Sequence, residues 1–76
     1  MQKLSTLQPG QTAIITTMQQ NGPVKRRLLE MGLVRGSKIK IIRRAPLGDP
    51  IEIEIRDYKL TLRKKEADTI TVEAQP

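Results

Sequence analysis

The segment from Ile51 to Leu62 constrains the fold of this 76-residue chain more than any other feature. Isoleucines alternate with glutamates over residues 51–55, and apolar side chains alternate with polar ones over residues 58–62. Because successive side chains of a strand point to opposite faces, each run predicts a strand with one buried face. A tight turn at Arg56-Asp57 joins the two strands in a single register. That register sets Ile55 opposite Tyr58, Ile53 opposite Leu60 and Ile51 opposite Leu62, with Tyr58 inward, and it pairs Glu54 with Lys59 and Glu52 with Thr61 and, diagonally, Arg63.

The rest of the chain predicts further short strands and one helix. Strands are expected over residues 12–18 and 37–44 and around Ile70 and Val72, where β-branched residues recur. Residues 21–23 break the first of these strands and open a helix from about Val24 to Met31, with Asn21 or Gly22 as its cap. Val24, Leu28 and Met31 recur at helical spacing and are expected to pack on the sheet, and Gly32 is expected to end the helix in a left-handed conformation.

The predicted fold is mostly β and occupies residues 1–76 as a single domain. A chain of this length buries only roughly 60% of its unfolded surface, and Tyr58 is its only aromatic residue. Five short strands and one helix cannot hide both faces of an open sheet. We therefore expect a small SH3-like antiparallel barrel of about five strands, with one short helix inserted after the first strand.

Composition excludes several kinds of chemistry. The chain contains neither Cys nor His, which removes disulfides, thiol and imidazole catalysis, and metal sites that use those ligands. No nucleophile–base pair or paired-acid site can be assembled, so we expect a protein that is not an enzyme and has no cofactor. Fourteen basic and eight acidic residues give a net charge of +6, which favours an anionic partner. No apolar run is fit to span a bilayer or to serve as a signal peptide, so the expected location is the cytoplasm.

Four ordered segments resemble one protein family. They are Leu7-Gln8-Pro9-Gly10, the run from Arg27 to Gly36, the run from Ala45 to Ile51, and the run from Leu62 to Ala67 with Ile70 and Val72 behind it. Their order and spacing are similar to those of the FeoA family. The resemblance implies an SH3-like barrel that acts in bacterial ferrous iron uptake beside FeoB, a membrane permease with a cytoplasmic GTPase domain. It also implies kinship with the terminal domain of diphtheria-toxin-repressor-type regulators.

The sequence departs from this family at one turn. Many members have glycine where this chain has Asp57. A tight hairpin needs a positive φ, which Asp tolerates less well than Gly. Replacing Asp57 by Gly is therefore predicted to be neutral or stabilising.

Two segments are candidates for partner binding on physical grounds. The first helical turn carries three cations where the helix dipole favours negative charge, and Leu29 lies roughly 100° off the apolar stripe. The second segment is a loop limited by two prolines, with Leu47 between them. The alternative interpretations are a solvated charge run with an Arg26–Glu30 pair, a Leu29 at the core margin, and a rigid strand connection. The candidate contacts are Lys25, Arg26, Arg27, Leu29, Glu30, Pro46, Leu47 and Asp49.

Three functions stay open at this point. The first is a non-enzymatic adaptor that docks on the cytoplasmic GTPase part of a FeoB-type permease. The second is a nucleic-acid-binding barrel, which the charge favours but the lack of stacking aromatics disfavours. The third is a stand-alone module of the repressor type. The sequence leaves self-association open.

Overall fold

Apolar residues alternate with charged ones most clearly over Ile51–Ile55, and several of the turns contain glycine or proline. In a computed structural model, which describes residues 2–18 and 22–75, the predicted strands and helix are present with small shifts of their ends. The elements of this part of the chain are β1 (Gln2–Lys3), the 3-10 turn η1 (Leu4–Thr6), β2 (Thr12–Met18), α1 (Pro23–Glu30), β3 (Lys38–Arg44), β4 (Ile51–Ile55), β5 (Tyr58–Leu62), α2 (Lys64–Ala67) and β6 (Ile70–Gln75).

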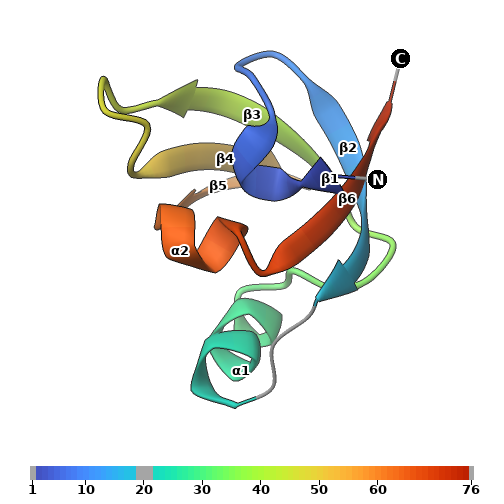
Figure 1. Cartoon of the computed structure of the whole chain (residues 1–76). Helices are drawn as coiled ribbons and strands as arrows, with labels where there is room; N and C mark the ends of the chain where they lie inside the picture. The colour runs from blue at the N-terminus through green and yellow to red at the C-terminus, as the bar shows by residue number, and fades with distance from the viewer. Residues whose placement is uncertain (1, 19–21, 76) are drawn as a thin grey trace.

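The strands form one antiparallel sheet in the order β1-β6-β2-β3-β4-β5. The sheet curls around its buried face, and α1 projects from one end of it (Figure 1). The predicted mostly β, SH3-like fold is thus confirmed. The described sheet has six strands rather than about five, because Gln2–Lys3 pairs with β6 over a length too short to show any periodicity. Over the same described residues, no helix is long and apolar enough to cross a bilayer.

The β4–β5 hairpin has the predicted register at all five pairs, from Ile51–Leu62 to Ile55–Tyr58. Its turn differs in one respect. The positive φ, 54°, falls at Arg56 and not at Asp57. The expectation that Asp57 carries the turn strain is therefore wrong, since the first of the two turn residues takes the left-handed conformation.

Glu52 lies opposite Thr61 of β5 as predicted, but its ion-pair partner is on β3. The β3–β4 register shifts between Ile41 and Arg43, which sets Arg43 opposite Glu52. Arg43 Nε donates a hydrogen bond to Glu52 Oε1 at 2.7 Å. The predicted pairing of Glu52 with Arg63 is wrong, because β5 ends at Leu62 and Arg63 is the cap residue that precedes α2.

The left-handed residue that terminates helix α1 is Gly32, as predicted, with a φ of 90°. It follows the cap residue Met31. The Leu33 N–H donates to the Leu28 carbonyl and the Gly32 N–H to the Leu29 carbonyl, both at 3.0 Å, which is the Schellman arrangement. The Tyr58 hydroxyl donates to the Met31 carbonyl beside this turn. Tyr58 lies opposite buried Ile55, as the register predicted, but at this end of the inward face its side chain is 41% exposed and reaches over the end of the helix.

The core is aliphatic, and α1 contributes to it through its second half. Leu28 is fully buried and Met31 packs against the core, whereas Val24 is 38% exposed. The prediction that Val24 packs on the sheet is wrong, because the helix leaves the sheet surface toward its N-terminus. Gly22 is the residue that precedes the helix, and Asn21 lies outside the described residues. The buried apolar residues of the sheet include Ala13, Ile15, Ile39, Ile41, Ile51, Ile53, Ile55, Leu62, Ile70 and Val72.

Candidate partner-binding surface

The first candidate segment is α1, which has no acidic residue in its first turn. Lys25 and Arg26 lie near the positive end of the helix dipole, an arrangement that costs stability when the charges have no partner. The prediction that Arg27 shares this first turn is wrong, because the helix begins at Pro23 and Arg27 lies in its last turn. Arg26 and Glu30 are both exposed, and no ion pair links them in the part of the chain that the structure describes. The predicted Arg26–Glu30 pair is absent from this surface, which leaves both charges available to a partner.

Arg27 is already engaged within the chain. Its guanidinium forms an ion pair with Glu66 of α2, whose residue exposure is 7%. Glu66 also accepts a hydrogen bond from the Arg63 N–H at 2.9 Å. Arg27 therefore fastens α1 to the barrel, while more than half of its side chain stays accessible.

Leu29 is 43% exposed and is not at the core margin that the sequence favoured. With Lys25 and Met18 it lines a surface hollow of about 300 Å³ between α1 and the end of β2. Thr16, Thr17 and Arg35 complete its wall. An apolar floor beside two cations suits an apolar side chain with an acidic neighbour.

The second candidate segment, residues 45–50, is a tightly held loop with an exposed tip. Leu47 is 95% exposed. The Gly48 N–H donates to the Ala45 carbonyl at 2.7 Å, and the Ala45 N–H donates to the Pro50 carbonyl at 3.0 Å. Arg44 Nη1 bonds the Leu7 carbonyl at 3.0 Å and so anchors the base of the loop. Leu47 thus lies at the tip of a loop that is held by hydrogen bonds at its base.

Asp49 serves the fold more than the surface. Its Oδ1 accepts the Lys64 N–H at 3.0 Å, which satisfies a main-chain donor at the start of α2. The loop of residues 45–50, which we call the Pro loop, is thereby tied to α2, and α2 is tied to α1 through the ion pair of Glu66 with Arg27.

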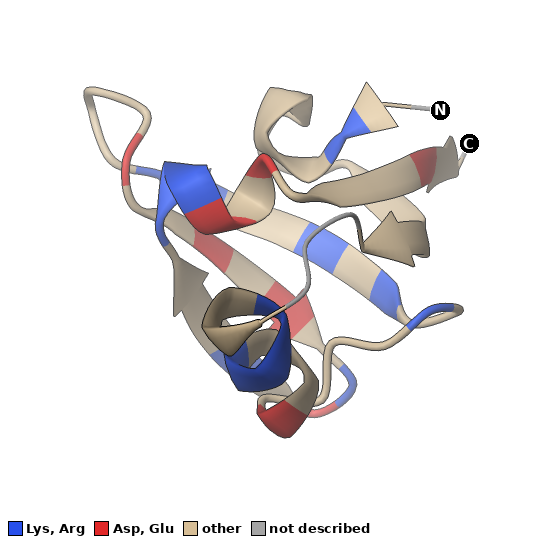
Figure 2. Cartoon of the chain, turned by 60° about the horizontal axis from the view of Figure 1, so that its bottom comes forward, with Lys and Arg blue, Asp and Glu red and all other residues tan. Residues whose placement is uncertain are grey.

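The short helix α2, which the sequence analysis missed, lies between the two candidate segments in both views (Figures 1 and 2). Its exposed lysines continue the positive charge of α1 toward the Pro loop (Figure 2). We call this surface the basic ridge; it consists of Lys25, Arg26, Arg27, Arg63, Lys64 and Lys65. The signal that could have found α2 is Glu66, three residues after Arg63, because a Glu at that position often accepts the first main-chain N–H.

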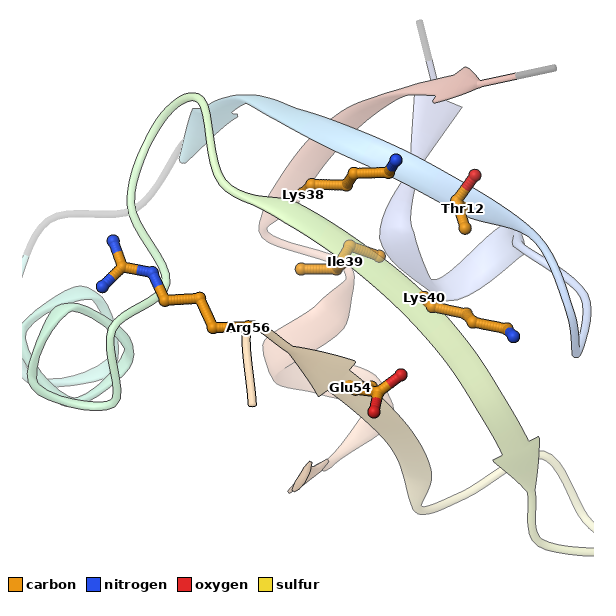
Figure 3. A pocket seen from close by; sticks show the side chains of 6 residues that line it. All are labelled: Thr12, Lys38, Ile39, Lys40, Glu54 and Arg56. Carbon is orange, nitrogen blue, oxygen red and sulfur yellow. The ribbon is translucent and has the colours of Figure 1, made fainter. Parts of the chain in front are cut away.

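Another hollow, of about 330 Å³, lies on the outer face of β3 and β4 (Figure 3). Lys38 and Lys40 project from β3 on either side of Ile39, and Glu54 projects from β4 near Lys40 (Figure 3). The Arg56 side chain extends toward α1, away from Glu54. These charges form an open surface with no convergent set of donors.

Carboxylates do not gather into a metal site in the part of the chain that the structure describes. Among residues 2–18 and 22–75, no cluster of three or more metal-ligating side chains occurs. Glu52 is bound by Arg43, Glu66 by Arg27, and Asp68 accepts a hydrogen bond from the Ser5 hydroxyl. These acids hold the fold together.

Comparison with known proteins agrees with this architecture. The FeoA domain model matches residues 2–74. Over 71 residues, the chain is 41% identical to the Fe(2+) transport protein A/Fe(2+) transporter FeoB fusion protein of Porphyromonas gingivalis. That match covers 93% of this chain and 8% of the fusion protein, so the chain corresponds to a small part of this relative.

Two solved structures extend the comparison. The FeoA protein from Chlorobium tepidum superposes with a TM-score of 0.84 at 50% identity, over 92% of this chain and 67% of that one. A manganese-dependent transcriptional repressor gives a TM-score of 0.89 over 97% of this chain and 41% of its own, at 19% identity, and shares the fold alone. A family model that spans nearly the whole sequence, with relatives at 41% and 50% identity, establishes that this chain belongs to the FeoA family.

Proposed function

We propose that this chain is a non-enzymatic accessory domain of ferrous iron uptake that docks on the cytoplasmic GTPase part of a FeoB-type permease. One observation carries the proposal. In the P. gingivalis relative, a segment 41% identical to this chain belongs to the same polypeptide as a FeoB transporter. Covalent fusion keeps two domains at a high effective concentration. We therefore expect the two domains to share an interface.

The candidate surface has the composition of such an interface. Leu47 and Leu29 supply exposed apolar anchors on the two candidate segments, and α2, which carries part of the basic ridge, lies between these segments (Figures 1 and 2). Interfaces commonly place a few apolar anchors inside a polar rim, and the anchors account for most of the affinity. Because the rim is basic, the matching surface on the permease is expected to be acidic.

An adaptor also suits the chemistry of the chain better than an iron carrier does. Transition-metal sites commonly use His or Cys, and the sequence has neither. Several carboxylates are already engaged by arginine, hydroxyl or main-chain donors. The proposed role in iron uptake is therefore regulatory or mechanical.

The test is the binding of the chain to its own cell's ferrous permease at physiological salt, measured by calorimetry. Full-length permease in detergent and the isolated GTPase part are titrated separately, each with and without nucleotide. Saturable binding that Leu47→Asp or Leu29→Asp weakens at least about tenfold supports the proposal. Ala74→Asp is the matched control, because Ala74 is an exposed apolar residue on β6, away from the ridge. Absence of binding to both forms, also with ferrous iron added, overturns the proposal.

A further inference from the structure

Strand β5 forms one edge of the sheet. It pairs with β4 alone, and in the described part of the chain no strand lies on its other side. Lys59 and Thr61 at the middle of this edge are both exposed. An exposed edge strand can accept a further strand from another polypeptide.

The register identifies which main-chain groups are available there. In an antiparallel hairpin closed by two residues, the pair beside the turn exchanges both hydrogen bonds, and every second pair does so again. In β5 these pairs involve Tyr58, Leu60 and Leu62. The N–H and C=O groups of Lys59 and Thr61 therefore point away from β4, toward the open side of the sheet.

A hollow extends from this edge toward the Pro loop. It has a volume of about 400 Å³, and Thr61, Glu52, Arg43, Arg44, Pro46 and Pro50 line it. Because Arg43, Glu52 and Thr61 lie opposite one another on β3, β4 and β5, the hollow lies over these strands and borders both the edge strand and the loop that carries Leu47.

Charge indicates what kind of strand fits. Lys59 lies on the edge strand, and Arg63, Lys64 and Lys65 come directly after the end of that strand. The acids of the neighbouring strand are partly neutralised, because Glu52 is bound by Arg43 and Glu54 lies opposite both Lys40 and Lys59. Two copies of this chain pairing edge to edge would bring two sets of cations together, which is unfavourable. The charge therefore favours an acidic partner over a second copy.

We propose that β5 accepts, as an added strand, an acidic extended segment from the GTPase part of the permease. This inference rests on the proposed function and specifies how the partner is held. Main-chain hydrogen bonds from Lys59 and Thr61 would give the segment its register, and the following cations would select its charge.

The decisive variant is Thr61→Pro. Proline at this position removes an outward N–H and leaves every hydrogen bond between β4 and β5 intact. Its matched control is Thr61→Val, which keeps the N–H and the branched shape and replaces the hydroxyl by a methyl group. In titrations with the isolated GTPase part, Thr61→Pro is expected to weaken binding at least about tenfold, and Thr61→Val less than about threefold. Equal affinity of Thr61→Pro and the unchanged chain refutes the added strand and leaves the proposed function standing. If the unchanged chain does not bind at all, both fail.

Amide hydrogen exchange tests the same inference without a substitution, in case Thr61→Pro does not fold. In the isotopically labelled free chain, the amides of Lys59 and Thr61 are expected to exchange at least about tenfold faster than the amide of Leu60. Adding a saturating amount of the GTPase part is expected to slow Lys59 and Thr61 at least about tenfold. If these two amides exchange equally fast in the complex, β5 is not the docking edge.

Discussion

Arg27 of α1 forms an ion pair with Glu66 of α2, although 39 positions separate the two residues in the sequence. This ion pair links α1, which projects from one end of the barrel, to α2 (Figure 1). Because Arg27 lies in the last turn of α1, the cations at the positive end of the helix dipole are Lys25 and Arg26.

Replacing Arg27 by Ala is expected to lower the free energy of unfolding by about 1–2 kcal/mol, because a nearly buried carboxylate loses its counter-charge. Arg26→Ala is the matched control, since Arg26 is an exposed neighbour in the same helix, and its effect is expected to stay within about 0.5 kcal/mol. Urea unfolding of both variants measures the difference. Equal effects would show that the ion pair does not hold α1.

The hairpin turn supplies a second prediction. Arg56 has a φ of 54°, a conformation that glycine adopts without steric cost. Arg56→Gly is expected to raise the free energy of unfolding by about 0.5–1 kcal/mol. Asp57→Gly is expected to lower it by up to about 1 kcal/mol, because it only adds freedom to the unfolded chain. Thermal unfolding distinguishes the two, and the opposite order would place the strain at Asp57.

The hairpin was predictable because its two faces agree on one register. The isoleucines fix the inward face, and the Glu54–Lys59 pair fixes the outward one. Helix α2 was missed because four residues show no helical period and Arg63 is an unusual residue to precede a helix, which left Glu66 as its one local signal. The burial of Glu66 depends on Arg27, a contact between distant parts of the chain that no local pattern encodes.

The candidate site was predictable in part for a similar reason. The exposure of Leu47 follows from a short loop between prolines, which the sequence shows directly. The role of Asp49 depends on where α2 begins, because its carboxylate accepts the Lys64 N–H. Since the sequence analysis missed α2, it interpreted Asp49 as a partner contact.

The Gly32–Tyr58 contact supplies a third prediction. A Cβ at Gly32 would collide with the Tyr58 hydroxyl, and Gly32 also has a positive φ. Gly32→Ala is expected to cost about 2–3 kcal/mol through strain and collision together. Tyr58→Phe removes one hydrogen bond to Met31 and is expected to cost about 1 kcal/mol.

The double variant separates the two causes of the Gly32→Ala effect. Without the hydroxyl the added methyl group fits more easily, so the combined cost is expected to fall short of the sum by at least about 0.5 kcal/mol. A double-mutant cycle in urea measures this coupling. Strictly additive effects would mean that Tyr58 does not lie over Gly32 in solution.

The Pro loop supplies the last prediction, which separates a contact from its support. Leu47 is 95% exposed, so Leu47→Asp is expected to change the free energy of unfolding by less than about 0.5 kcal/mol. Asp49→Ala removes the acceptor of the Lys64 N–H and is expected to cost about 1 kcal/mol. If the loop docks on the permease as proposed, Asp49→Ala also weakens binding several-fold, because the partner must then order the loop. Leu47→Asp weakens binding more strongly with the fold intact. A loss of stability in Asp49→Ala without any loss of affinity would show that the loop is only a strand connection.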